Sequence, residues 1–276
     1  MPSLGFSIAA AWLLTIEIPS VMGTAKGRII SISILGIIAI LFSVKTISRN
    51  LDWENNFTLF THDVEISANS AKANAAAGAQ WLEKAIEMKN ETQRRILAGR
   101  SITYLRKALQ IYPKYRVASR DIGTAHFFAG SPIDSVIFYY DKTISLERME
   151  LLVYKNITKF IYIEPDIDRR ISILEHYNSI YGGVYELNYK LGNLYGRKKG
   201  DFQKAAYYFE IAVRLRPKSV EALANLGIAY LGMGQKEKAR QAWQKALSIK
   251  PEDMQIQENL RKLESEVQQE KEAGTL

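Results

Sequence analysis

The chain opens with two apolar stretches and then changes to a mixed apolar and polar pattern of helical period. The first fifty residues contain only five charged side chains, Glu17, Lys26, Arg28, Lys45 and Arg49, whereas the remainder of the chain contains sixty-one. Long uncharged stretches are typical of membrane spans, and apolar residues three and four apart are typical of water-exposed helices. The pattern therefore divides the chain near residue 48.

The second apolar stretch, residues 29–44, has no charge and is flanked by Arg28 and Lys45. At about 1.5 Å per residue it covers roughly 24 Å of a ~30 Å hydrocarbon core, and a snorkelling lysine extends it. A buried core helix is the alternative, but such a helix needs a polar face and this stretch offers only serines. We predict a transmembrane helix at about 28–47.

The first apolar stretch, residues 1–25, has Glu17 as its one charge and a proline near each end. It predicts a second transmembrane helix at about 4–20, and hence a helical hairpin. A secretory signal peptide is the alternative, but a basic leader and a clear cleavage site are missing. Charges flank the second span on both sides, so the positive-inside rule does not decide the orientation.

Beyond residue 70 the sequence repeats a pattern of small and large residues. Residues 220–251 carry it most completely, with Gly227 and Ala239 at small positions, Trp243 at a large one and Pro251 at the end. Small residues let two antiparallel helices approach closely, an aromatic side chain fills the gap, and proline ends the second helix. The pattern resembles the tetratricopeptide repeat, in which helix pairs stack into a superhelix.

The repeat recurs along the array at nearly constant spacing. Its small position falls at Gly78, Gly123, Thr158, Gly192 and Gly227, with intervals of 45, 35, 34 and 35 residues. The third unit is degenerate, and an eleven-residue insertion at 84–94 is expected to lengthen both helices of the first unit. Five units exceed the roughly three that such an array needs for a continuous core.

We therefore predict an all-α fold, a transmembrane helical hairpin followed by a right-handed tetratricopeptide superhelix of about five helix pairs and a capping helix. The predicted domains are the hairpin at 1–48, a juxtamembrane linker at 49–69, the array at 70–251, and a capping helix and tail at 252–276. The five predicted units are 70–113, 114–148, 149–183, 184–217 and 218–251.

Composition narrows the chemistry of the chain. It has no cysteine and only three histidines, far apart, which argues against disulfides, thiol catalysis and common metal sites. The net charge of +8 is spread singly over predicted helices, so no nucleic-acid partner is expected. No phosphate-binding loop or hydrolase motif occurs. We expect no enzymatic activity within this chain and no cofactor.

The concave face of such a superhelix is lined by the first helix of each unit. Positions two or three before the small residue, one after it and four after it are expected to face this groove. The predicted peptide-binding residues are Arg120, Thr124, Phe127, Lys155, Asn156, Lys159, Tyr162, Tyr189, Lys190, Asn193 and Asn225. Amides pair with a peptide backbone and lysines attract carboxylates or phosphates, so an anionic protein or peptide segment is the expected partner. Asp121 is the one acid expected to compensate the positive charge of this groove. The alternative is that these residues form an ordinary solvent-exposed face and bind no peptide.

Three segments carry a further resemblance: MPSLGF at the start, SRNLDWENNFTLF after the second span, and ANSAKANAAAGAQW at the start of the array. Together they resemble the C-terminal part of the transmembrane and tetratricopeptide repeat containing (TMTC) proteins and their bacterial relatives, which are multi-span glycosyltransferases of the GT-C type. The resemblance covers essentially the whole chain. It implies that Met1 and residues 49–276 lie outside the cytoplasm, in the periplasm or the lumen of the endoplasmic reticulum, and that Lys26 and Arg28 lie inside.

The same resemblance has a limit. GT-C enzymes use polyprenyl-phosphate sugars and acidic residues in the first external loop of a longer membrane domain, and no segment here corresponds to that loop. The chain is thus expected to be a fragment, a mis-started reading frame or a split version that pairs with a catalytic membrane subunit. The leading hypothesis is a membrane-anchored scaffold for protein–protein interaction on the extracytoplasmic side. The alternative is the substrate-presenting part of a polyprenyl-phosphate-dependent protein O-mannosyltransferase.

Overall fold

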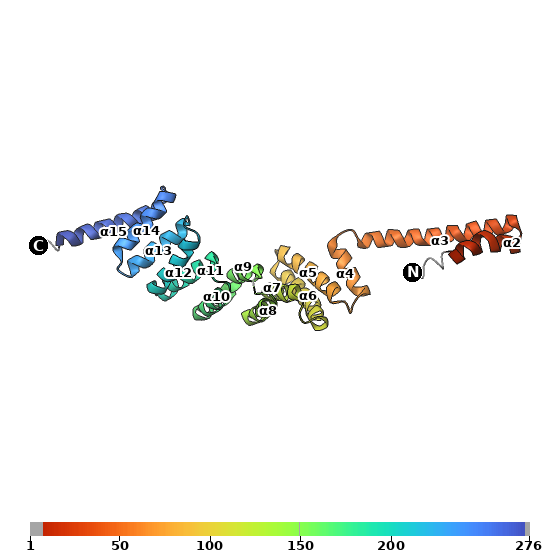
Figure 1. Ribbon diagram of the computed structural model, residues 1–276, viewed down its shortest axis with the longest axis horizontal. Helices are drawn as coiled ribbons and strands as arrows, with labels where there is room; N and C mark the ends of the chain where they lie inside the picture. The colour runs from red at the N-terminus through yellow and green to blue at the C-terminus, as the bar shows by residue number, and fades with distance from the viewer. Residues whose placement is uncertain (1–7, 149, 274–276) are drawn as a thin grey trace.

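The computed structural model describes residues 8–148 and 150–273, and these residues form an elongated all-helical molecule (Figure 1). A hairpin of apolar helices lies at one end of the long axis and the last helix lies at the other. The MPSLGF segment and the start of the first predicted span lie outside the described residues.

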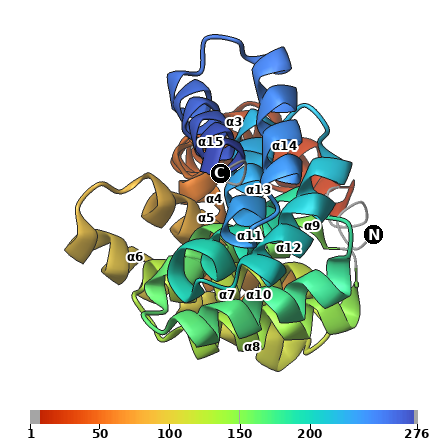
Figure 2. The ribbon, with the colours of Figure 1, turned by 90° about the vertical axis from the view of Figure 1, so that its left-hand side faces the viewer.

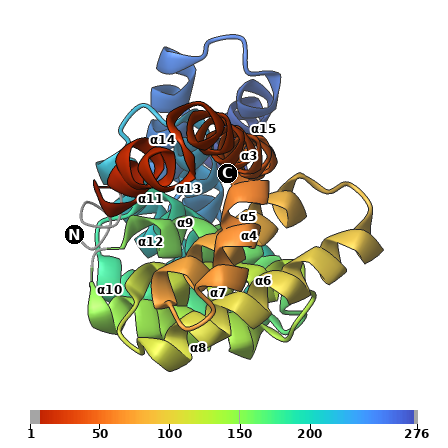
Figure 3. The same cartoon turned by 90° about the vertical axis from the view of Figure 1, so that its right-hand side faces the viewer.

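The N-terminal helices form a closely packed hairpin. A helix at Ile8–Met22, which includes the π-helical turn η1 (Leu13–Glu17) and α2 (Ile18–Met22), lies beside α3 (Thr24–Asp52), as Figure 3 shows. Gly23 turns the chain between them with φ of 83°, a value that favours glycine. A Cβ at Gly27 would lie 2.3 Å from the Cα of Pro19, so glycine permits this approach.

One helix within the described ranges is long and apolar enough to cross a membrane. It spans Thr24–Ser48, with a mean hydropathy of 2.2 over its most apolar window, and only 6% of that window is buried. The preceding apolar helix at Ile8–Met22 is shorter than a full span. A core helix of a water-soluble protein would be mostly covered, whereas α3 exposes its large aliphatic side chains.

The segment after the hairpin, which the sequence predicted as a linker, forms a further helix. This helix, α4 (Asn56–Ile66), begins with a capping box in which Asn55 accepts a bond from the backbone N–H of Thr58. Phe57 packs edge-on against Trp81 of the first unit, with ring centroids 4.7 Å apart. The helix α4 therefore packs on α5, at the start of the array, and precedes the first helix pair.

Within the described residues, the array consists of five helix pairs and a final helix. The pairs are α5 (Ala71–Glu87) with α6 (Glu91–Ile111), α7 (Arg116–Phe128) with α8 (Ile133–Leu146), α9 (Leu151–Phe160) with α10 (Ile167–Tyr181), α11 (Tyr185–Leu194) with α12 (Phe202–Leu215), and α13 (Val220–Gly232) with α14 (Lys236–Ile249). Short turns η2 (Ile161–Ile163) and η3 (Tyr195–Lys199) extend α9 and α11, and α15 (Met254–Ala273) covers the last pair. The inserted first pair projects beyond the others (Figure 2).

Polar residues just before the helices start several of them. Ser70, Asn90, Asp201 and Ser219 each accept a hydrogen bond from the backbone N–H three residues later. Each such cap satisfies a donor that the helix leaves unpaired, and contributes about 1 kcal/mol. Local sequence thus defines the start of helices in the first, fourth and fifth units.

The small positions of the repeat are contact points between paired helices. The facing residues are Gly78 and Leu105, Gly123 and Tyr140, Gly192 and Phe209, and Gly227 and Trp243. A Cβ at any of these four glycines would lie 2.3 to 2.7 Å from the facing side chain. Such distances are below van der Waals contact, so the close approach depends on glycine. The third unit has the larger Thr158 at this position.

Carboxylates one repeat apart join the second, third and fourth units to the units that follow them. Asp141, Glu175 and Glu210 lie on the second helices α8, α10 and α12, and each accepts a hydrogen bond from a tyrosine of the following unit. The donors are Tyr177 at 3.1 Å, Tyr208 at 2.9 Å and Tyr230 at 2.8 Å respectively. These bonds add directional contacts to the apolar packing between units.

Candidate functional site

The predicted groove cation of the second unit is neutralised by neighbouring acids. Arg120 donates from Nε to Asp121 at 2.9 Å and lies 3.9 Å from Glu150. Arg116, one turn earlier on α7, pairs with Glu147 and also with Glu150. Burial raises the pKa of Asp121 above its ordinary value, and the charge of Arg120 opposes that rise. Arg120 is therefore part of a structural ion-pair cluster between the second and third units.

Three further predicted residues lie at the same junction. Thr124 is buried, and its hydroxyl lies 3.0 Å from the hydroxyl of Tyr140. Asn156 of α9 donates to this Thr124 hydroxyl at 3.1 Å, so the two predicted groove residues bond each other. Phe127 stacks on Phe160 with ring centroids 3.6 Å apart. These side chains hold units together, and only part of their surface faces the groove.

The exposed positive charge of the groove lies on α9. Lys155 and Lys159 are exposed and form no ion pair with any residue that the structure describes. Tyr162, 57% exposed, lies three residues after Lys159. Lys190 of the next unit donates to the Tyr162 hydroxyl at 2.9 Å, and its Nζ lies 4.5 Å from the ring centre. The structure thus brings four predicted residues together as a cationic and aromatic surface.

The predicted residues of the fourth and fifth units form an amide cluster. Asn225 donates to the hydroxyl of Tyr189 at 3.2 Å and to Oδ1 of Asn193 at 3.5 Å. Arg197 in turn donates to Oδ1 of Asn225 at 3.4 Å. The bonds of 3.5 and 3.4 Å are at the long limit of hydrogen bonding. The amides of Asn193 and Asn225 and the guanidinium of Arg197 can therefore form shorter hydrogen bonds with another partner.

Beside this cluster lies a small apolar cavity of about 60 Å³. Its lining includes Gly196 and Arg197, two residues of η3 that the sequence analysis missed. Gly196 occupies the fourth position after the small residue, where the second and third units have Phe127 and Tyr162. A glycine at a repeat position that has a large side chain in those units is visible in the sequence, and it could have indicated the cavity.

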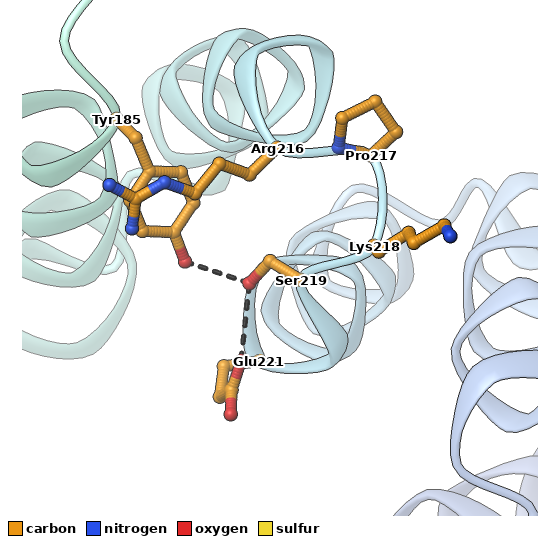
Figure 4. A pocket seen from close by; sticks show the side chains of 6 residues that line it. All are labelled: Tyr185, Arg216, Pro217, Lys218, Ser219 and Glu221. Atoms are coloured by element: carbon orange, nitrogen blue, oxygen red, sulfur yellow. Dashed lines mark hydrogen bonds between the residues drawn. The ribbon is translucent and has the colours of Figure 1, made fainter.

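A second, open pocket of about 620 Å³ lies where the α12–α13 turn meets α11 (Figure 4). Its Tyr185 hydroxyl lies 2.7 Å from Oγ of Ser219, and the guanidinium of Arg216 lies 4.1 Å from the Tyr185 ring centre. Burial raises the pKa of Tyr185, and Arg216 also pairs with Glu186. Within this pocket the hydroxyls of Tyr185 and Ser219 bond each other, and Ser219 also donates to Glu221 at 3.2 Å.

No group of three or more histidine, aspartate or glutamate side chains able to hold a metal occurs within residues 8–148 and 150–273. The candidate site is a surface of lysine, amide and aromatic groups, with the Lys155–Lys190 surface at one end and the small cavity at the other.

Comparisons with known proteins agree with this architecture. The tetratricopeptide repeat family model matches residues 220–253, and a second model of the same repeat matches residues 185–219. The solved structure of YrrB, described as a tetratricopeptide-repeat protein with an unusual peptide-binding site, aligns with a TM-score of 0.51 at 15% identity, over 73% of this chain and 97% of that one. This likeness shows the fold.

Among curated proteins, human protein O-mannosyl-transferase TMTC3 is 24% identical over 275 residues, 99% of this chain and 26% of that protein. Human protein O-mannosyl-transferase TMTC2 is 43% identical over 61 residues, 22% of this chain and 7% of that protein. The chain thus spans about a quarter of the length of the TMTC3 relative. Residues 185–253 thus match the tetratricopeptide repeat, and the chain is similar to human TMTC3 over nearly its whole length.

Proposed function

We propose that this chain is a membrane-anchored tetratricopeptide scaffold that binds an anionic protein segment in its groove, on the extracytoplasmic side of the membrane. The observation that carries the anchor is the exposure of α3. It combines a span-length apolar helix with almost no burial, which is costly in water and favourable in lipid. A short helix, α4, connects this helix to the array.

The partner chemistry follows from the unpaired charges. Lys155 and Lys159 are one turn apart on α9, so both side chains reach the same stretch of a bound segment. Ammonium groups without an acidic neighbour attract carboxylates or phosphates, and this attraction increases the rate of encounter. An anionic segment therefore has a matching surface here, with the Tyr162 ring beside it.

Charge reversal tests the groove. The probe is a fluorescent pool of aspartate-rich nonapeptides, titrated with the full chain in detergent micelles. Replacing Lys155 and Lys159 together by glutamate should weaken binding by on the order of 1 to 3 kcal/mol, because two charge-assisted contacts become repulsive. The helical circular dichroism signal should not change, because both side chains are exposed.

The matched control reverses two exposed charges on second helices, Arg214→Glu in α12 with Lys245→Glu in α14. Both double variants change the net charge equally. If the control weakens the probe as much as the groove variant, bulk charge alone drives binding and the proposed groove is wrong. A loss confined to the α9 variant supports it.

A second candidate function rests on the similarity to TMTC3, a protein O-mannosyl-transferase, over 99% of this chain. In this case the array would present a protein substrate to a catalytic membrane domain that uses a polyprenyl-phosphate sugar. The coding sequence upstream of Met1 separates the two candidates. In-frame continuation through several hydrophobic spans with an acidic first loop favours the transferase, and a stop codon with a ribosome-binding site favours the separate anchored scaffold.

A further inference from the structure

We propose that the small cavity between η3, α12 and α13 receives one small aliphatic side chain of the bound segment, while Arg197 binds a carboxylate of the same segment. This proposal rests on the proposed function, because it requires an extended segment in the groove. It adds a rule for the sequence of that segment.

The walls of the cavity are held in place by aromatic rings that pack on glycines. A Cβ at Gly192 would lie 2.7 Å from the ring of Phe209, and one at Gly232 would lie 2.5 Å from the ring of Phe202. Both phenylalanines line the cavity. Because each ring lies against backbone with no side chain between, neither can move far to close the space.

The cavity exists because Gly196 has no side chain. The ideal Cβ at this position would lie 3.3 Å from the Cβ of Ala205, so a larger residue would fill the space. The volume of about 60 Å³ is less than half that of the ~150 Å³ engineered apolar cavity that binds benzene. The side chains of alanine and valine fit such a volume, and an aromatic ring does not.

Polar groups surround the opening of this apolar space. Arg197 is exposed, and it donates a hydrogen bond to Oδ1 of Asn225 at 3.4 Å. No ion pair joins it to an acid within the described part of the chain. Asn193 and Asn225 present amides beside it. An unpaired guanidinium next to amides matches a carboxylate attached to a peptide backbone.

The geometry of an extended segment relates the two contacts. Side chains two residues apart point to the same side of an extended chain. A small aliphatic residue in the cavity thus places the side chains two positions away on the side of Arg197. The structure assigns this site a peptide with alanine or valine and an aspartate or glutamate two residues from it.

Positional peptide pools test this rule. Each pool contains fluorescent nonapeptides with aspartate two residues before and after a central residue, which is glycine, alanine, valine, leucine or phenylalanine, and all other positions are randomised. Binding to the full chain in detergent micelles should be roughly tenfold tighter for the valine pool than for the glycine pool, because apolar surface is buried. The phenylalanine pool should show no such gain.

Three variants assign the preference to the cavity. Gly196→Leu fills it and should reduce the valine-to-glycine ratio to less than about twofold, whereas Gly99→Leu, at a helical glycine with nothing within 4 Å, should leave the ratio unchanged. Arg197→Gln alters only an exposed side chain, so folding is maintained. It should weaken all aspartate-containing pools about five- to tenfold and preserve the valine preference.

The outcomes separate this proposal from the proposed function. If no pool binds the full chain, both are wrong. If the pools bind through Lys155 and Lys159 but do not distinguish valine from glycine, or keep the preference in Gly196→Leu, only the cavity proposal is wrong. If Gly196→Leu loses its helical signal, the pool preference and the Arg197→Gln result still decide the proposal.

Discussion

The side-chain amide of Asn156 donates a 3.1 Å hydrogen bond to the hydroxyl of Thr124, 32 residues earlier in the chain. Both residues were predicted from the repeat pattern to bind a peptide, and the structure uses them to join two units. Thr124 is buried and also lies 3.0 Å from the hydroxyl of buried Tyr140. Replacing Thr124 should therefore lower the stability of the fold, which would not be expected of a residue that only binds a ligand.

Thr124→Val should destabilise the fold by about 1 to 3 kcal/mol, because valine keeps the shape but removes a hydrogen-bond partner from the buried Tyr140 hydroxyl and from the half-buried Asn156 amide. Urea denaturation followed by circular dichroism of the full chain in detergent measures the change. Thr103→Val, at an exposed position of α6, is the control and should stay within about 0.5 kcal/mol. Unchanged stability with weaker peptide binding would instead assign Thr124 to the ligand.

The glycine contacts between paired helices predict opposite effects of the same substitution. Gly192→Ala should destabilise the fold by about 1 to 3 kcal/mol, because its Cβ would lie 2.7 Å from the Phe209 ring. Gly99→Ala, where nothing lies within 4 Å, should stabilise it by about 0.5 to 1 kcal/mol through helix propensity. Denaturation midpoints of the two variants measure both effects, and changes of the same sign would contradict the packing described here.

Burial gives His126 a pH dependence of known sign. Desolvation, together with the nearby charge of Arg106, lowers the pKa of His126 below its ordinary value of 6.5. The unfolded chain then binds the proton more readily, so the contribution of His126 to stability is present above pH 6.5 and is lost as the pH falls through its lower folded pKa. Stability measured between pH 7.5 and 5 should fall less in His126→Gln than in the original chain. An equal fall in both would assign the pH dependence to other groups.

Single-cysteine variants test the proposed topology without background, because the chain contains no cysteine. Lys198→Cys lies in η3 of the array, and Lys26→Cys lies at the hairpin turn; both side chains are exposed. In sealed vesicles whose outer face corresponds to the extracytoplasmic side, a membrane-impermeant maleimide should label Lys198→Cys and should reach Lys26→Cys only after detergent is added. The reverse pattern would invert the orientation, and labelling of both in intact vesicles would contradict the span.

The sequence alone determined the helix pairs of this protein, because their signals are local. Gly227 and Trp243, or Gly192 and Phe209, lie within one unit, and their spacing reflects the packing of two adjacent helices. The apolar character of α3 is equally local, since a long uncharged run does not depend on any distant partner.

Only the tertiary structure decided which groove side chains remain available to a ligand. Arg120 is compensated by Glu150 of the next unit, Asn156 bonds Thr124, and Arg197 meets Asn225, across separations of 28 to 32 residues. These pairings depend on how one unit is placed on the next, and the repeat pattern does not encode that placement residue by residue. The cavity at Gly196 and the helix α4 have the same origin, because both arise from packing between segments that the repeat pattern treats as independent.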